Sequence, residues 1–195
     1  MIKCKNVFLK TLEREDLPDI YKIILQEDMG NAFSTTYQEL TLSSLGPYLL
    51  SACQGTTTKA FTVRRHSKII GFISLKDICP IKRSAEIGEL AIIKKYQKPH
   101  KDAIFKASFA YEVAGTIAIY AFEVLNLHKL YAYTFGNNPA VDNIYKAGNW
   151  VIEGKSRDYV CRNGKWIDQI SWGLLKKEYD ECINYTKLKE FINWK

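Results

Sequence analysis

The sequence contains no apolar run that approaches the roughly 20 residues of a membrane-spanning helix, so no spanning segment is expected. The first residues, 1–16, lack the apolar stretch of a secretory signal and soon become acidic. Neither the scattered cysteines nor the three histidines have the spacing of metal ligands. The cysteines are Cys4, Cys53, Cys79, Cys161 and Cys182. These absences predict a cytoplasmic protein without membrane contact or a metal site, whose thiols are reduced and mostly buried.

The composition gives no sign of disorder. With 195 residues, of which 47% are hydrophobic, the chain is long enough to form one domain around a buried core. The formal net charge of +7 favours anionic partners. The basic residues are spread along the chain without a nucleic-acid-binding motif, so nucleic acid is not favoured as a partner. A solvated basic surface is the alternative explanation of the charge.

The N-terminal quarter predicts a strand and a helix. Residues 6–9 are expected to form the strand, and Asp16 is expected to cap a helix that has Pro18 in its first turn and ends before Gly30. Residues 31–58 are polar and hard to place. A second helix there is suggested by Leu42, Leu45, Leu49 and Leu50.

The next segment predicts an antiparallel set of strands. Residues 60–64 and 69–78 flank a short polar link and form a hairpin that Pro80 ends. Residues 84–93 follow as a third strand. Its second half is apolar on both faces, which is typical of a central position in a sheet.

The second half predicts two helices, a strand between them and a closing hairpin. One amphipathic helix begins near Ser108. The strand 129–135 follows, and then a short helix that carries Tyr145. Asn163-Gly164 is a strong signal for a type I′ hairpin turn. Residues 176–195 are expected to form a C-terminal helix.

The order of helix, strand, polar turn and helix in residues 120–150 resembles the acetyl-CoA-binding half of the GNAT N-acetyltransferase superfamily. Residues 84–93 (SAEIGELAII) resemble the central strand of that family. The later run EGKSRDYVCRNGKWIDQISWGLL is similar to the closing hairpin of its branch that acetylates ribosomal-protein alanine and amino sugars. The resemblance implies an α/β fold with a mixed, mostly antiparallel central sheet and helices on both faces. It also implies a single domain over residues 1–195, with 176–195 as a helical extension.

The resemblance implies an N-acetyltransferase that moves acetyl from acetyl-CoA to a primary amine. The acceptor is expected to be a small molecule, with a nucleotide-linked amino sugar favoured, or a protein N-terminus. The alternative is a catalytically inactive protein of the same fold that serves binding or assembly. A homodimer is left open, because the C-terminal segment is expected to pack either on the sheet or on a partner chain.

The resemblance also places the cofactor. In the family, two neighbouring parallel strands diverge, and the pantetheine arm lies between them, paired with the main chain of the first strand. Here the diverging strands would be 86–93 and 130–135. The binding groups would be main-chain groups of Leu90, Ala91 and Ile92.

The expected pyrophosphate loop departs from the family pattern, because glycine is absent between Gly88 and Gly115. The family uses Gln or Arg, two residues, Gly, one residue, and then Gly or Ala at a helix N-terminus. Gln97 matches the start of this motif. Its end is matched, with serine for glycine, by Ser108, Phe109 and Ala110. Either this helix start still binds phosphate with help from lysines of the segment between Gln97 and Ser108, or that segment no longer takes coenzyme A.

The general acid implied by the resemblance is Tyr145. Counted from Asn138, it lies where the family motif Asn-x-x-Ala-x-x-x-Tyr requires the tyrosine that protonates the departing thiolate. The alternative is a buried tyrosine with a structural hydrogen bond. Asn138, or its neighbour Asn137, is expected to cap the helix or to contact the cofactor.

Glu86 and Glu89 are the candidate bases, because they are carboxylates on a largely apolar strand. Their separation of three places them on opposite faces of a regular strand, so at most one is expected to face the pocket. Glu89 is preferred. A salt bridge to a neighbouring strand is the alternative role of either residue.

Overall fold

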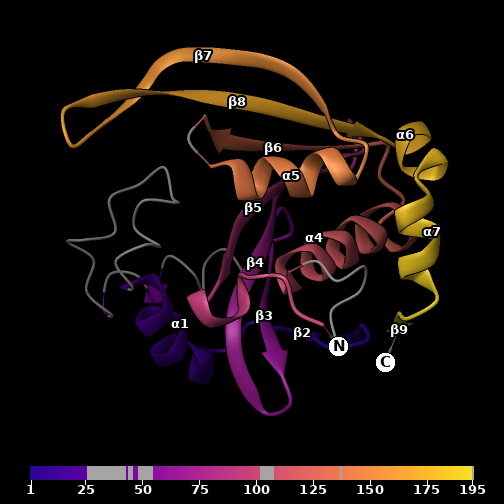
Figure 1. Cartoon of the computed structure of the whole chain (residues 1–195). Helices are drawn as coiled ribbons and strands as arrows, with labels where there is room; N and C mark the ends of the chain where they lie inside the picture. Colours follow the sequence, from indigo (N-terminus) through magenta and orange to yellow (C-terminus); the bar gives the residue numbers. More distant parts are fainter. Residues whose placement is uncertain (26–42, 44–45, 48–54, 102–107, 137, 195) are drawn as a thin grey trace.

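The computed structural model describes residues 1–25, 43, 46–47, 55–101, 108–136 and 138–194 (Figure 1). In these residues nine strands form one sheet in the order β7-β8-β6-β5-β4-β3-β2-β1-β9. All neighbouring strands are antiparallel except β5 and β6, which are parallel. The strands are β1 (Ile2–Lys3), β2 (Phe8–Thr11), β3 (Lys59–Arg65), β4 (Lys68–Cys79), β5 (Ser84–Ile92), β6 (Lys129–Phe135), β7 (Val151–Arg162), β8 (Lys165–Leu175) and β9 (Asn193–Trp194).

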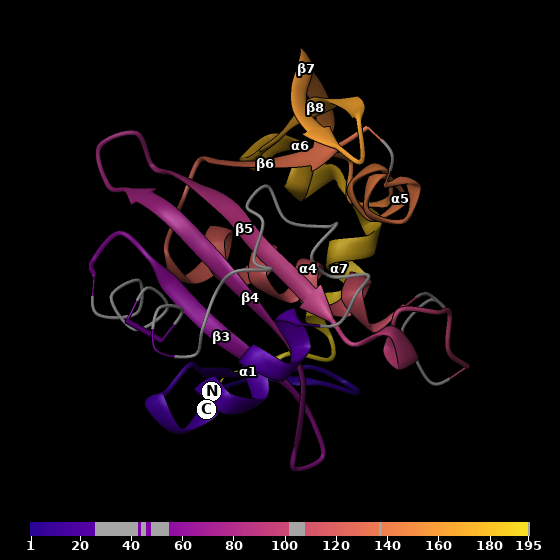
Figure 2. The same cartoon turned by 90° about the vertical axis from the view of Figure 1, so that its left-hand side faces the viewer.

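Helices cover both faces of this sheet (Figure 2). The α-helices are α1 (Leu17–Ile24), α4 (Phe109–Ile119), α5 (Pro139–Ala147), α6 (Lys176–Glu181) and α7 (Ile183–Lys189). Short 3₁₀ turns span Arg14–Asp16 and Lys94–Tyr96, and a π-helix, Tyr120–Val124, extends α4. No helix in the described ranges is long and apolar enough to cross a membrane. The predicted mixed, mostly antiparallel α/β fold is confirmed.

The alternation of side chains along β4 explains the two layers. Phe72 packs in the cluster of α1, whereas Ile73 and Leu75 pack in the larger core beneath α4. Successive residues of a strand point to opposite faces of the sheet, so one apolar strand serves both cores. Burial on both faces was predicted for the second half of β5. Strand β4 is also buried on both faces.

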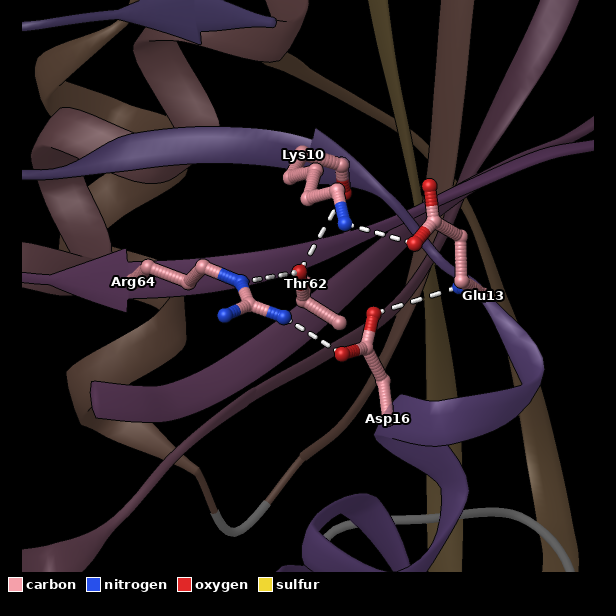
Figure 3. A network of polar contacts seen from close by, with 5 residues as sticks. All are labelled: Lys10, Glu13, Asp16, Thr62 and Arg64. Atoms are coloured by element: carbon pink, nitrogen blue, oxygen red, sulfur yellow. Dashed lines mark hydrogen bonds and ion pairs between the residues drawn. The ribbon is translucent and has the colours of Figure 1, made fainter. Parts of the chain in front are cut away.

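Helix α1 is fixed to the sheet by a polar network around Arg64 (Figure 3). The Arg64 guanidinium donates to the Asp16 carboxylate and, at 3.2 Å, to the Thr62 hydroxyl. Thr62 in turn donates to the main-chain carbonyl of Lys10, and Asp16 accepts from the main-chain N–H of Glu13. Asp16 precedes α1 as predicted, but its side chain does not cap that helix. It joins the start of α1 to strand β3 instead.

The C-terminal segment differs from the single helix expected for residues 176–195. The backbone is extended at Cys182, which separates α6 from α7. Strand β9 then pairs with β1, so the two ends of the chain lie close together in Figure 1. Helix α7 packs on α4, where a Cβ atom added at Gly115 would lie 2.4 Å from Leu188. Gly115 therefore serves contact with α7 rather than with the sheet. The interpretation of residues 1–195 as one domain stays a prediction.

Two further expectations concern the leucines between residues 31 and 58 and the cysteines. The leucines that suggested a helix between residues 31 and 58 lie outside the described residues. Four cysteines are described, and all are free thiols, but only Cys182 is buried, whereas Cys161 is exposed. The expectation of mostly buried thiols is therefore wrong for the described cysteines.

Candidate active site

Strands β5 and β6 diverge and open a cleft in the sheet. Their parallel pairing runs from Ser84 opposite Lys129 to Glu86 opposite Tyr131. Beyond that point β5 continues beside β4, and β6 continues beside β8 (Figure 1). The two strands thus each keep one partner and separate from one another, as the resemblance to the family implied.

A cavity of about 630 Å³ lies in this cleft. It is lined by β4, β5 and β6, by α5, and by the β7–β8 hairpin. Glu86, Glu89 and Tyr145, the three candidate catalytic residues, all line it, and so do Leu90 and Asn138. Side chains from segments far apart in the sequence therefore meet at one small-molecule-sized space.

Both carboxylates face the cavity because β5 contains a bulge. Ile73 pairs with Leu90, but Leu75 pairs with Ile87, so Ser74 of β4 lies opposite two residues of β5. The extra residue reverses the alternation of side chains after Gly88. The expectation that Glu86 and Glu89 lie on opposite faces is therefore wrong.

Lys76 lies between the two glutamates, and the sequence analysis did not identify it. Its Nζ is 3.3 Å from Glu86 Oε1 and 3.1 Å from Glu89 Oε1. Ser74 also donates to Glu89, at 2.6 Å. Lys76 stands directly opposite Glu86 in the β4–β5 ladder, and the charged side chain within an apolar strand was the available signal. The predicted alternative, a salt bridge to a neighbouring strand, is present for both glutamates.

Gly88 makes this arrangement possible. A Cβ atom at position 88 would lie 2.4 Å from Ser74 Oγ and 2.5 Å from Lys76 Cε. These distances are far below a normal contact, so the bare backbone of Gly88 provides the space in which the Lys76 side chain crosses β5.

The environment separates the pKa values of the two carboxyl groups. Burial raises the pKa of Glu86, and the nearby ammonium of Lys76 offsets this only in part. Burial acts in the same direction on Glu89, but the charge of Lys76 and the hydrogen bond from Ser74 outweigh it, so the pKa of Glu89 is lowered. Burial disfavours the charged form of Lys76, but the charges of Glu89 and Glu86 together outweigh burial and raise the pKa of Lys76. Glu86 is therefore the stronger base of the pair.

Tyr145 is buried, and its ring lies close to two tryptophans. The ring centroids of Trp150 and Trp172 lie 4.7 Å and 5.6 Å from that of Tyr145. Burial raises the pKa of the Tyr145 hydroxyl, with a further contribution from the negative charges of Glu86 and Asp142. Within the described part of the chain, this hydroxyl has no hydrogen-bond partner. The predicted structural hydrogen bond is thus not found there.

The helix that carries Tyr145 is positioned by its two ends. Trp172 donates to the Thr134 hydroxyl at 2.9 Å, and Thr134 donates to Asp142 in the first turns of α5 at 3.2 Å. After its C-terminal end, Asn149 adopts a left-handed φ of 59°, a conformation that asparagine tolerates better than most residues. Asn138 precedes α5 without a side-chain capping hydrogen bond, so simple capping by this side chain is not observed. Asn137 lies outside the described residues.

Comparison with known proteins identifies the family. The sequence model of the acetyltransferase (GNAT) domain matches residues 6–148. The chain belongs to the GNAT acetyltransferase family.

Similar proteins include spermidine acetyltransferases. The spermidine N(1)-acetyltransferase of Vibrio cholerae is 27% identical over 173 residues, which cover 88% of this chain and 94% of the relative. The enzyme of the same name from Escherichia coli K12 is 24% identical, with 92% and 91% covered. The structure of the Vibrio cholerae spermidine N-acetyltransferase in complex with CoA and spermine has a TM-score of 0.78 at 25% identity, with 90% and 99% covered.

This GNAT chain is accordingly an acyl-CoA-dependent N-acetyltransferase that uses acetyl-CoA and acts on a primary amine. The alternative of a catalytically inactive protein of the same fold is not supported. The comparisons support the superfamily, but they do not single out the branch that acetylates ribosomal-protein alanine or amino sugars.

The divergence of β5 from β6 fits the pantetheine arm of the cofactor. From Leu90 to Ile92, β5 pairs with β4 on one edge and has no ladder to β6 on the other. Such an edge offers main-chain groups to an extended amide-containing chain. Gln97 donates to the Ile92 carbonyl at 2.7 Å, so part of this edge is already bonded and Gln97 points back to β5.

The resemblance places the phosphates of the cofactor at the start of α4. Ser108 has extended backbone and precedes α4, as predicted. Phe109 is fully buried under Arg65, whose guanidinium carbon lies 4.7 Å from the ring centroid, so its side chain belongs to the core. Ala110 is half-buried beside it. Residues 102–107, which directly precede Ser108, lie outside the described residues.

Proposed function

We propose that this chain transfers acetyl from acetyl-CoA to the primary amine of a small molecule that reaches the cavity as an ammonium ion. The observation that carries the proposal is the position of Glu86 and Glu89 on one side of the cavity that Tyr145 also lines. Buried carboxylates bind an ammonium group and can then take its proton. Acetyl-CoA supplies the thioester whose acyl carbon receives the amine.

The three side chains have separate roles in this proposal. Glu86 accepts the proton of the ammonium, because burial raises its pKa and makes it the better base. Glu89 stays ionised and holds the ammonium by charge. The amine nitrogen forms the new C–N bond as the C–S bond breaks, and the Tyr145 hydroxyl gives its proton to the departing sulfur. The second proton, which the nitrogen loses on becoming an amide, restores the Tyr145 hydroxyl. This assignment prefers Glu86 over Glu89 as the base.

The cofactor would be held by the edge of β5 and the start of α4. Main-chain groups of Leu90, Ala91 and Ile92 would pair with the pantetheine amides. The N-terminus of α4 at Ser108 would face the phosphates, where main-chain N–H groups and the helix dipole favour negative charge. Asn138 lines the same cavity as Leu90 and Tyr145.

Several acceptors fit a primary-amine acetyltransferase. The relatives are named for spermidine. The resemblance of the β7–β8 hairpin suggests a nucleotide-linked amino sugar or a protein N-terminus. The cavity of about 630 Å³ is of the size that small molecules occupy, which favours a small molecule over a protein chain.

The test is an acetylation assay with a panel of acceptors: spermidine, a nucleotide-linked amino sugar, and a short peptide with a free N-terminus. Thiol release gives the rate, and mass spectrometry locates the acetyl group. We expect turnover with a small-molecule amine and a drop in kcat/KM of about 10²- to 10⁴-fold in Glu86→Gln. Glu153→Gln is the matched control, because Glu153 pairs with Lys129 away from the cavity. Absence of turnover with every amine, together with no calorimetric heat on adding acetyl-CoA, would refute the proposal.

A further inference from the structure

The described lining of the active-site cavity contains three charged side chains, which are Lys76, Glu86 and Glu89. Two carboxylates and one ammonium leave a net charge of −1. A pocket of this charge balances one bound ammonium ion. A second ammonium in the same space would find no further carboxylate among the described residues that line the cavity.

Lys76 is a fixed part of this cavity. Its ammonium contacts both carboxylates, and 29% of its side chain is exposed. Its methylene groups lie over Gly88, in space that any other residue at that position would fill. Displacing Lys76 would break two partly buried ion pairs, so its positive charge stays beside the reacting amine.

The opposite wall of the cavity is uncharged but rich in hydrogen-bonding groups. These come from β6 and from the β7–β8 hairpin: Tyr133, Ser156, Tyr159, Gln169 and Ser171. Another hollow on the same hairpin is lined by Lys155, Arg157, Asp158 and Asp168, and there Lys155 pairs with Asp168 at 2.6 Å. Asp168 also accepts from the main-chain N–H of Asp158, which has a left-handed φ of 49°. This irregular stretch of β7 sets Tyr159 at the cavity.

From these features we infer that the acceptor carries one ammonium group, at its reacting end, on an uncharged body with hydroxyl or amide groups. Lys76 is the specificity-determining residue, because it repels a second ammonium close to the first. Hydroxyl groups of the acceptor body bond to the tyrosine, serine and glutamine side chains of the opposite wall. An amino sugar has this chemistry. A polyamine, whose ammonium groups are separated by only three or four carbons, does not.

The inference rests on the proposed function, since it assumes that the amine binds at Glu86 and Glu89. It gives this chain an acceptor different from the one in the names of its relatives. The inference is drawn from Lys76 and Gly88 of this chain, not from the fold, which the chain shares with those relatives.

The test compares two acceptors of equal length, 3-aminopropan-1-ol and 1,3-diaminopropane, at pH 7. They differ only in whether the far end is a hydroxyl or an ammonium group. The wild-type chain should show kcat/KM at least about tenfold higher for the amino alcohol, since a like charge within a few ångströms is strongly unfavourable in a partly buried site. In Lys76→Met this ratio should fall towards one or invert. In Lys76→Arg, which keeps the charge, the ratio should be retained.

Lys129→Met is the control for loss of a lysine. Lys129 is 33% exposed and pairs with Glu153, so it matches Lys76 in burial but lies outside the cavity lining. Its ratio should equal that of the wild type. Calorimetric binding of both amines to the CoA complex provides the same comparison without turnover.

The outcomes separate the two proposals. Equal kcat/KM for the two acceptors in the wild-type chain would overturn the inference and leave the proposed function in place. An unchanged ratio in a folded Lys76→Met variant would do the same. Should Lys76→Met fail to fold, the wild-type ratio still decides. Turnover of no amine at all would remove the proposed function and this inference with it.

Discussion

Glu86 and Glu89 lie on the same side of β5 and share the ammonium group of Lys76, although a regular strand would turn them to opposite faces. One extra residue in β5 causes this, because the bulge opposite Ser74 reverses the alternation of side chains. The bulge lies where β5 leaves β6, so the same irregularity opens the cleft and places both carboxylates in it.

Gly88→Ala should destabilise the fold by about 1–3 kcal/mol, because the added methyl group would collide with Ser74 and Lys76. The collision should also displace the Lys76 side chain and weaken its contact with Glu89. Gly154→Ala is the control, since its nearest neighbour would lie at an ordinary 4.0 Å. Denaturant unfolding of both variants measures the difference, and equal stabilities would contradict the packing described for Lys76.

Tyr145→Phe should lower kcat by about 10²- to 10⁴-fold, because it removes the proton donor for the departing thiolate. The melting temperature should change little. The ring keeps its contacts with Trp150 and Trp172, and the hydroxyl has no partner among the described residues. A variant with lower stability and intact kcat would instead show a structural hydroxyl and would exclude Tyr145 as the acid.

Arg64→Met should destabilise the chain by about 1.5–3 kcal/mol, since it leaves the Asp16 carboxylate without its charged donor. The pair is largely buried, with side-chain exposures of 18% for Arg64 and 7% for Asp16. Asp19→Asn tests a nearby exposed pair with Lys22 and should change stability by less than about 0.5 kcal/mol. An Arg64→Met chain as stable as the control would show that this network does not hold α1 in place.

Lys76→Met should reverse the effect that ionisation of Glu89 has on the free energy of unfolding. In the wild type the lowered pKa of Glu89 contributes stability above its unfolded pKa of about 4.3, and this is lost as the pH falls through the folded pKa. Without Lys76, burial dominates and raises that pKa, so ionisation of Glu89 costs stability as the pH rises through about 4.3.

The difference in melting temperature between wild type and Lys76→Met should therefore widen from about pH 4 to pH 7. Lys129→Met, measured over the same range, should show no such widening. A difference that stays constant with pH would mean that Lys76 does not control the ionisation of the two glutamates.

Local signals in the sequence determined much of the fold. Asn163-Gly164 predicted a type I′ turn, and both residues have positive φ, at 49° and 73°. The spacing from Asn138 to Tyr145 placed the tyrosine on the helix after the second diverging strand, where the structure has it. These features depend on neighbours in the chain, because turn chemistry and helical periodicity act over a few residues.

Only the tertiary structure decided how the active site is arranged. The bulge in β5 depends on how β4 and β5 pair. No residue of β5 alone specifies the register in which Ser74 lies opposite Gly88 and Glu89. The role of Lys76 follows from that register, since its partners are 10 and 13 positions away in the sequence. The C-terminal segment was predicted as one helix from its own pattern, but contact with Gly115 of α4 and pairing with β1 made it two short helices and a strand. Periodicity predicts which element forms, whereas long-range packing sets which residues it meets.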